Sequence, residues 1–272
     1  AADLALMPCD ISKAERGYRL FDAASYSLSL PAPDLLPEQS LDDAFAALAW
    51  HLLGSSQRLA EQYRFNGHWK LLEQWLQQLT DLRALLSSLG QAAPRASSHL
   101  LREALDALLK DWRPLLQAGQ QDAQRRQDAP ARFAEELGNT RWGHFSLQAS
   151  LWLLQRQWVS TRNERGSRQG QAPLGKWLPR LLAAEVADLP LKRYQQQPED
   201  LAEQLPRIER LLAWLRHARP LSALPEVDRL YGELLKLEEL AHLPINAEQL
   251  AVRAMQAHTV TTLRAWKQLS RS

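Results

Sequence analysis

Apolar side chains recur at helical spacing through most of the chain after Ser40. In the first such stretch, leucines and aromatic residues stand three, four or seven positions apart, which is the spacing of an amphipathic helix. Ser40 precedes this stretch, and Asp42 and Asp43 follow in its first turn, a combination typical of a helix N-terminus. The same spacing predicts further helices near residues 68–89, 97–117, 140–159, 174–188, 198–218, 225–241 and 246–269.

Two polar stretches interrupt this pattern. Residues 117–131, QAGQQDAQRRQDAPA, indicate a loop or a short helix, and residues 161–175, TRNERGSRQGQAPLG, indicate a long loop. Between them, the helix expected at 140–159 carries two apolar stripes. Because so wide an apolar surface needs protein on most sides, we expect this helix to lie in the core. The stripes are Trp142, Phe145, Ala149 and Trp152, and Leu147, Leu151, Leu154 and Trp158.

Long helices joined by short, proline-marked turns pack antiparallel. The sequence therefore predicts an all-α protein with two antiparallel four-helix bundles in a helical domain over 41–272, the halves lying at roughly 41–165 and 171–272. A weak internal repeat at one constant offset favours two halves related by a pseudo-two-fold axis. The matched sets are Leu72, Trp75, Leu79, Leu82 and Arg83, and Leu205, Ile208, Leu212, Leu215 and Arg216.

Residues 1–40 have a different character. The segment YSLSL, residues 26–30, alternates apolar and serine side chains as a strand does. The prolines of LPAPDLLPEQ, residues 30–39, favour an extended linker, because proline disfavours helix at the residue before it. Upstream, SKAERGYRLF, residues 12–21, is basic, broken by a glycine and unlike the helical remainder. We therefore expect an extended N-terminal segment before the bundles.

Composition narrows the class of protein without specifying a partner. Of the 272 residues, 45% are hydrophobic and 24% are charged, as in ordinary globular proteins, and the net charge is only +2. Cys9 is the only cysteine, which excludes an intrachain disulfide and fits a reducing compartment, so a cytoplasmic location is expected. No apolar run approaches the length of a membrane span, and the modest net charge disfavours nucleic-acid binding.

Sequence motifs for catalysis are missing. The seven histidines form no HExxH pair, and the chain has neither a G-x-S-x-G elbow nor a Walker loop. Acid pairs such as Glu135 and Glu136 are neighbours in sequence, and such neighbours do not face each other on a helix. We expect no catalytic residue, no metal site and no cofactor in this chain, and we expect most of its ten tryptophans to lie in the core.

Positive charge gathers locally along the chain. Residues 137–193 hold nine arginines and lysines against three acids, and residues 250–272 hold four basic residues and no acid. The planar guanidinium of arginine donates two parallel hydrogen bonds to phosphate oxygens, which suits a polyanion. Ordinary solvated surface charge is the alternative for any single residue. The candidate binding residues are Arg156, Arg162, Arg165, Arg168, Lys176 and Arg180.

The segment ISKAERGYRL, followed by a proline-rich linker and a long helical region, resembles the domain junction of two-domain CYTH–CHAD proteins. In that family a triphosphate-tunnel (CYTH) domain precedes a helical CHAD domain. The resemblance implies that residues 1–40 are the end of a missing tunnel domain plus a linker, with that CYTH domain as N-terminal partner. It also implies paired four-helix bundles with inorganic polyphosphate as ligand, in a parent that could be an inorganic triphosphatase.

The histidine motif for which CHAD domains are named is degenerate here. In the family, a histidine is followed by basic residues and, nine residues on, by a Leu-Arg pair. Placing that pair on Leu82–Arg83 or on Leu215–Arg216 puts Glu73 or Pro206 at the histidine position. Only the two arginines match, and they join the candidate polyphosphate-binding residues.

Two interpretations of function stay open at this point. In the first, the chain is a non-catalytic helical accessory module that binds inorganic polyphosphate or a similar polyanion through its arginine and lysine clusters. In the second, loss of the motif means loss of binding, and the bundles brace a neighbouring domain or form an oligomer. A continuous basic surface would favour the first interpretation, and scattered arginines the second.

Overall fold

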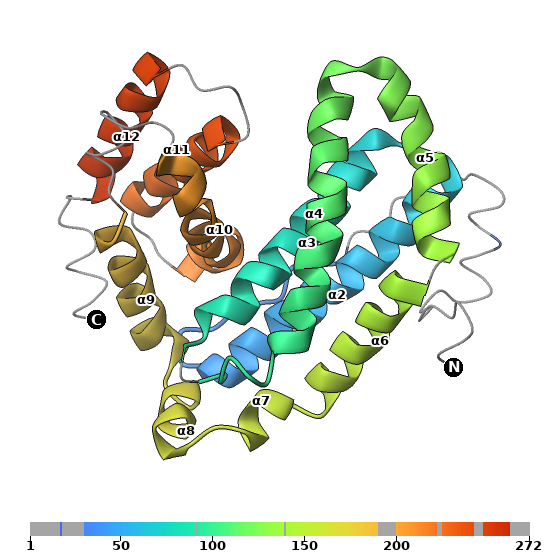
Figure 1. Ribbon diagram of the computed structural model, residues 1–272. Helices are drawn as coiled ribbons and strands as arrows, with labels where there is room; N and C mark the ends of the chain where they lie inside the picture. The colour runs from blue at the N-terminus through green and yellow to red at the C-terminus, as the bar shows by residue number, and fades with distance from the viewer. Residues whose placement is uncertain are drawn as a thin grey trace. The chain divides into compact units, whose positions relative to one another are not determined.

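The computed structural model describes residue 17 and residues 30–90, 92–138, 140–189, 200–221, 225–241 and 247–261. Over these residues the protein is all-α, as predicted (Figure 1). Helices α2 to α12 and one short 3-10 turn make up its regular structure, and the described ranges contain no β-strand. A single β-bridge within them joins Ser40 and Pro173.

The chain divides into two compact units, which are described separately. Unit 1 comprises residues 1–32, 46–86 and 93–161, and unit 2 comprises residues 33–45, 87–92 and 162–272. Helix α2 therefore begins in unit 2 and continues in unit 1. The pseudo-two-fold relation between halves of the chain stays a prediction.

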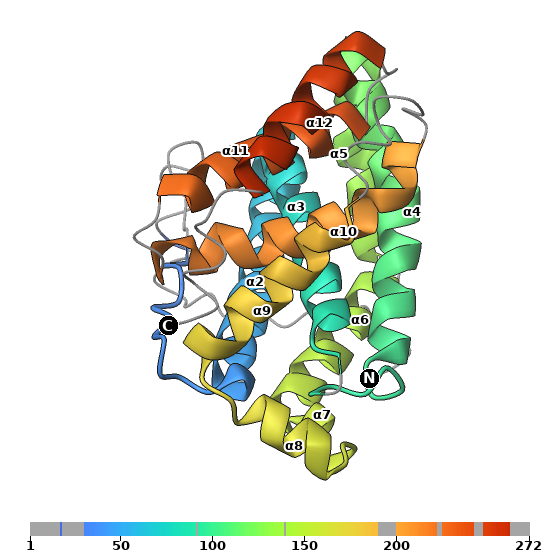
Figure 2. The ribbon, with the colours of Figure 1, turned by 90° about the vertical axis from the view of Figure 1, so that its left-hand side faces the viewer.

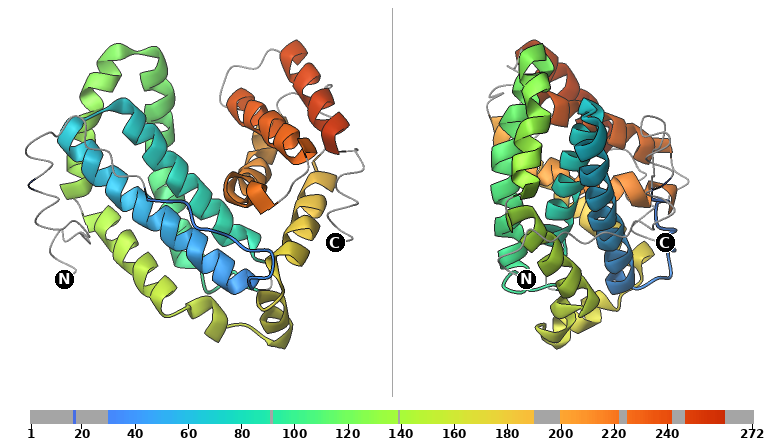
Figure 3. Two further views of the ribbon diagram at one scale, coloured as in Figure 1. Left: turned by 180° about the vertical axis from the view of Figure 1, so that it is seen from behind. Right: turned by 90° about the vertical axis from the view of Figure 1, so that its right-hand side faces the viewer.

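Unit 1 is built from the helices of the first 161 residues, seen from behind in Figure 3. Helix α4 packs against α5 and α6, and α5 packs against α6. These helices are α2 (Leu41–Asn66), α3 (Trp69–Ser88), α4 (His99–Gln121), α5 (Ala123–Gly138), α6 (Thr140–Leu154) and α7 (Gln157–Ser160).

An aromatic cluster forms the centre of unit 1. Trp75 of α3 meets the rings of Trp112, Phe133 and Trp142 edge-on, with ring centroids 5.8, 5.1 and 5.4 Å apart. Tyr63 of α2 meets Phe133 in the same geometry, at 4.8 Å. All five side chains are buried. Edge-to-face pairs add stabilisation beyond the area they bury, so this cluster holds α2 to α6 together and confirms a core role for these tryptophans.

Unit 2 is a smaller set of helices in which α10 packs on α9 and α11, and α11 packs on α12 (Figure 2). Trp177 of α9 meets Trp214 of α10 with ring centroids 5.1 Å apart, and the Trp214 indole donates a hydrogen bond of 2.8 Å to Ser88 Oγ. The elements are α8 (Glu164–Gly170), α9 (Leu174–Ala187), α10 (Asp200–Ala218), the 3-10 turn η2 (Arg219–Leu221), α11 (Pro225–Ala241) and α12 (Ala247–Thr261).

The polar stretch at 117–131 is helical almost throughout, because α4 runs to Gln121 and α5 begins at Ala123. Its alanine, glutamine and arginine residues are good helix formers, which explains why so polar a stretch is helical. Gly119 has a packing role instead. A Cβ atom at this position would overlap the indole ring of Trp69, so glycine lets α4 approach that ring closely.

The long loop predicted at 161–175 is wrong, because residues 164–170 form helix α8. Asn163 caps this helix, since its side chain accepts a hydrogen bond of 2.9 Å from the backbone N–H of Gly166. Glu164 lies in the first turn, where its charge suits the helix dipole.

The helix expected at 140–159 is broken, and only one of its stripes lies in the core. Helix α6 ends at Leu154, and Arg156 takes a left-handed backbone conformation, with φ of 46°, before α7 begins. The Trp142 stripe is buried, as predicted. The other stripe is exposed along α6, at 41% for Leu147, 50% for Leu151 and 73% for Leu154, so α6 is not surrounded by protein.

Residues 30–39 contain no helix or strand, as the prolines predict. The strand prediction for YSLSL falls on residues of which only Leu30 is described, and most of SKAERGYRLF also lies outside the described residues. The helix predicted at 246–269 is described only from Ala247 to Thr261.

Candidate functional site

The start of helix α9 is tied by main-chain hydrogen bonds to the segment that leads into α2. Within unit 2, Leu41 N donates to Ala172 O at 2.9 Å, and Gly175 N donates to Pro37 O at 2.8 Å. Glycine at position 175 favours this close approach, because a Cβ atom there would lie 3.1 Å from the Pro37 carbonyl oxygen, a tight contact. These bonds fix α8 and α9 on the first turn of α2.

Arg162 and Asp42 form a buried ion pair at this junction. Two parallel hydrogen bonds of 2.7 Å join the guanidinium to the carboxylate, and the side chains are only 3% and 10% exposed. The predicted site residue Arg162 therefore does not offer its guanidinium to a ligand. Gly170 of α8 leaves the space for the pair, since a Cβ atom there would lie 2.6 Å from both carboxylate oxygens of Asp42.

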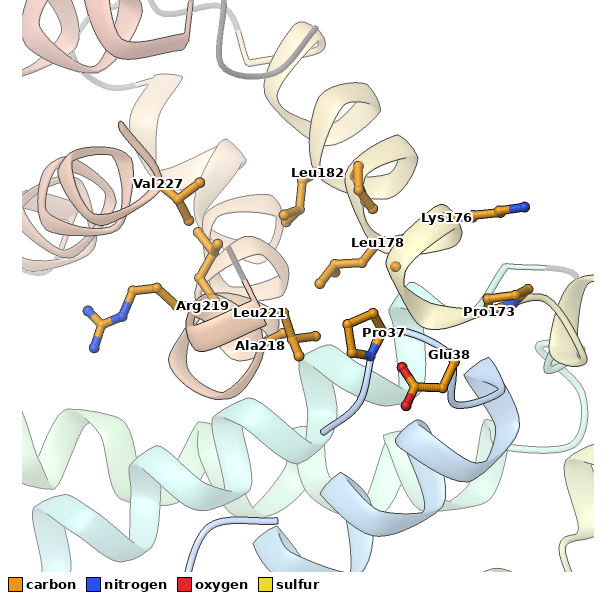
Figure 4. Close-up of a pocket in the computed structure, with 13 residues that line it drawn as sticks. Pro37, Glu38, Pro173, Lys176, Leu178, Leu182, Ala218, Arg219, Leu221 and Val227 are labelled. Atoms are coloured by element: carbon orange, nitrogen blue, oxygen red, sulfur yellow. The ribbon is translucent and has the colours of Figure 1, made fainter. Parts of the chain in front are cut away.

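Four of the predicted site residues are exposed on α8 and α9, and we call them the α8–α9 cationic cluster: Arg165, Arg168, Lys176 and Arg180. The two arginines of α8 stand three residues apart, and the two cations of α9 stand four apart, so each pair shares one side of its helix. None of the four forms an ion pair within the described part of the chain. Figure 4 shows the Lys176 side chain pointing away from the apolar interior of unit 2.

Two further acids of the same basic stretch are paired with cations of α10. Glu185 of α9 accepts from Arg210 at 2.9 Å and from Arg207 at 3.1 Å. Asp188 lies 3.5 Å from the Arg207 guanidinium. Because α10 supplies the cations that pair with these two carboxylates, residues 164–180 keep four exposed cations against one acid, Glu164. Sequence alone does not predict this pairing, since Arg207 and Arg210 lie outside the basic stretch at 137–193.

The two arginines that match the family motif are engaged in ion pairs. Arg83 donates to Asp106 of α4 at 2.7 and 2.9 Å, and Arg216 donates to Glu238 of α11 at 3.1 Å. Each arginine thus meets an acid on the next long helix, 23 or 22 residues further along the chain. The remaining candidate, Arg156, is exposed but belongs to unit 1, apart from the cluster in unit 2.

An apolar pocket of about 510 Å³ lies within unit 2, and no sequence pattern predicted it. Leucines 178 and 182 of α9, Leu221 of η2 and Val227 of α11 line it together with Pro37 (Figure 4). Its volume falls in the range of small-molecule sites. Three charged residues also line it: Glu38, Lys176 and Arg219.

The described residues show neither a metal-binding group nor a membrane-spanning helix. No group of three or more histidine, cysteine, aspartate or glutamate side chains is placed to hold a metal ion in that part of the chain. Within the same ranges, no helix combines the length and the apolar character that crossing a bilayer requires. A comparison with protein-family models gave no match, and a comparison with curated proteins gave none either.

Proposed function

We propose that unit 2 binds inorganic polyphosphate, or a similar flexible polyanion, through the α8–α9 cationic cluster. The observation that carries this proposal is an excess of exposed positive charge. Residues 164–180 hold four cations that form no ion pair in the described ranges, against one acid, Glu164, while Glu185 and Asp188 are paired with α10.

The chemistry of the cluster suits phosphate. Arginine presents parallel N–H donors that match two phosphate oxygens, and lysine adds a mobile point charge. A linear polyphosphate carries closely spaced negative charges and bends easily, so one molecule can follow the cations of both helices. Binding of this kind releases counterions and therefore weakens steeply with salt.

The role we infer is that of a non-catalytic, CHAD-like accessory module, and a CYTH domain remains the proposed N-terminal partner. The ion pairs of Arg83 and Arg216 indicate that the motif arginines serve the fold, so the proposed ligand contacts fall on Arg165, Arg168, Lys176 and Arg180 instead. A cytoplasmic location is part of the same proposal.

Titration with long-chain polyphosphate at low salt tests the proposal. Exchanging both arginines of α8 (R165A with R168A) or both cations of α9 (K176A with R180A) should weaken binding roughly tenfold, because each variant loses two phosphate contacts. In the matched control, two exposed cations outside the cluster are replaced by alanine, Lys110→Ala with Arg229→Ala. This variant should bind polyphosphate like the unaltered protein. Equal affinity in all variants would place the ligand elsewhere.

The second candidate is a structural or interaction domain without a polyanion ligand. The buried pair of Arg162 and the ion pairs of Arg83 and Arg216 favour it, because three of the eight predicted site residues turn out to stabilise the fold. Absence of polyphosphate binding at low salt would support this candidate.

A further inference from the structure

The apolar pocket of unit 2 has no part in the proposed binding of polyphosphate. It encloses about 510 Å³, a volume typical of small-molecule sites. Its apolar lining comes from α9, α10, η2, α11 and the segment before α2, and includes Pro37, Leu178, Leu182, Leu215, Leu221 and Val227. Because these side chains carry no polar group, most of a ligand that fills the pocket must be apolar.

The walls of this pocket are fixed by contacts within unit 2. Gly175 N at the start of α9 donates a hydrogen bond of 2.8 Å to Pro37 O, which holds Pro37 in place. Leu178 and Leu182 stand one turn apart on α9 and are buried, on the side of the helix that faces η2 and α11 (Figure 4). Since the walls are in place before a ligand arrives, little free energy is lost in ordering them.

The three charged residues of the lining differ in how they are engaged. The Arg219 guanidinium lies 3.2 Å from the Asp228 carboxylate and 4.5 Å from the centre of the Tyr231 ring, so it is held by α11. Lys176 and Glu38 are exposed, and neither forms an ion pair in the part of the chain that the structure describes. Lys176 is therefore the cation that the pocket can offer to a ligand.

Lys176 also joins the pocket to the α8–α9 cationic cluster. The residue lines the pocket, while its ammonium group points away from the apolar interior (Figure 4). Lysine commonly places its stem along apolar surface and its charge in water in this way. Arg180 is exposed one turn further along α9, on the same side of the helix. The pocket thus lies beside two cations of one helix, against a single opposing charge on Glu38.

We infer that the pocket binds a single amphiphile with an apolar chain and a phosphate head, the chain among the leucines and the head at Lys176 and Arg180. Phosphate oxygens accept charge-assisted hydrogen bonds from both cations, whereas an ammonium head would be repelled by them. The site shares these two cations with the proposed polyphosphate site. It differs from that site in its need for the pocket, which polyphosphate has no apolar part to fill.

Titration calorimetry with alkyl phosphates, below the concentrations at which they form micelles, tests the inference on the unaltered protein. Octyl phosphate should bind roughly tenfold more tightly than hexyl phosphate, because two more methylene groups leave water. Octanol and octylammonium should each bind roughly tenfold more weakly than octyl phosphate, because they lose the charge-assisted contacts. No binding of octyl phosphate, affinity that does not depend on chain length, or tighter binding of octylammonium overturns the inference.

Variants of α9 locate the two parts of the ligand. Leu182→Trp fills the pocket and should weaken octyl phosphate binding roughly tenfold. Ala184→Trp is the matched control, since it places the same indole at an exposed position of the same helix. Lys176→Gln should weaken the binding of octyl phosphate and leave that of octanol unchanged. Circular dichroism checks that the variants keep their helix content, and equal affinities in Leu182→Trp and Ala184→Trp overturn the inference.

Polyphosphate separates this inference from the proposed function. Leu182→Trp should bind long-chain polyphosphate like the unaltered protein, because the cations remain, so each ligand can fail without the other. Loss of both ligands in this variant would show that the pocket is not a separate site. Vesicles that contain phosphatidylglycerol separate a free amphiphile from a membrane. Binding to these vesicles without binding of octyl phosphate would assign the cations to a lipid surface and overturn the inference.

Discussion

Arg162 lies 2.7 Å from Asp42 at both ends of its guanidinium fork, although 120 residues separate the two in sequence. The pair is almost wholly buried and joins the start of α2 to the segment that leads into α8. A buried pair of this kind is stabilising only as long as both charges are present.

Removing one partner of this pair should therefore destabilise unit 2. We predict that Arg162→Met lowers the free energy of unfolding by about 3 kcal/mol or more, because the carboxylate of Asp42 is left buried without its countercharge. The double variant Arg162→Met with Asp42→Leu should lose much less than the sum of the two single variants. Urea unfolding of the four proteins measures the coupling, and strictly additive losses would contradict a direct buried pair.

Gly170 should be intolerant of even one added carbon. A Cβ atom there would lie 2.6 Å from each carboxylate oxygen of Asp42, so Gly170→Ala should cost about 1–3 kcal/mol of unfolding free energy. Gly232 of α11 is the control, since a Cβ atom there meets nothing within 4 Å. Alanine at that position should stabilise the protein by about 0.5–1 kcal/mol, as it does in an open helix interior. Thermal melts that rank the two variants in the reverse order would refute this packing account.

The two motif arginines should differ in their effect on stability. Arg216 and Glu238 are both largely buried, whereas Asp106, the partner of Arg83, is more than half exposed. We predict that Arg216→Ala costs more unfolding free energy than Arg83→Ala, for which the loss should stay within about 1 kcal/mol. Neither change should weaken polyphosphate binding at low salt. A large loss of affinity for polyphosphate in a variant of unchanged stability would instead show that Arg83 or Arg216 contributes to binding.

Tyr63 should make the stability of unit 1 sensitive to alkaline pH. Burial raises the pKa of its hydroxyl to about 12, whereas an unfolded tyrosine titrates near 10. The folded form keeps the proton between these two values, so stability is complete below about pH 10 and falls as the pH rises toward 12. Tyr63→Phe removes this titration. Urea unfolding at pH 9 and pH 11 should show a smaller loss for the variant, and equal losses would exclude Tyr63 as the cause.

The spacing of apolar residues predicts most of the helices, because each helix buries one face and the residues of that face recur every three or four positions. In α3, Leu72, Trp75 and Leu79 stand at helical spacing and are all buried. The sequence pattern does not predict helix α8, because Gly166 and Gly170 are residues typical of loops. Its stability comes from the Asn163 cap and from a glycine that makes room for a distant ion pair, and spacing carries neither signal.

The candidate site was predictable only in part, for a similar reason. Sequence identifies cations but not their partners, so Arg165 and Arg162 looked alike in the basic stretch. Arg165 is exposed, whereas Arg162 is buried against the carboxylate of Asp42, 120 residues earlier in the chain. The apolar residues of α6 were recognised too, but spacing does not tell which side of a helix has a neighbour.

The salt dependence of polyphosphate affinity tests the central claim most directly. Four phosphate contacts on a flexible single strand predict a slope of about −3 in a plot of log affinity against log salt concentration, at roughly −0.7 for each contact. Replacing Arg165 and Arg168 together by alanine should flatten this slope to about −1.4, because only the two cations of α9 remain. A slope that is unchanged by these substitutions, or no binding at low salt, would contradict polyanion binding by the α8–α9 cationic cluster.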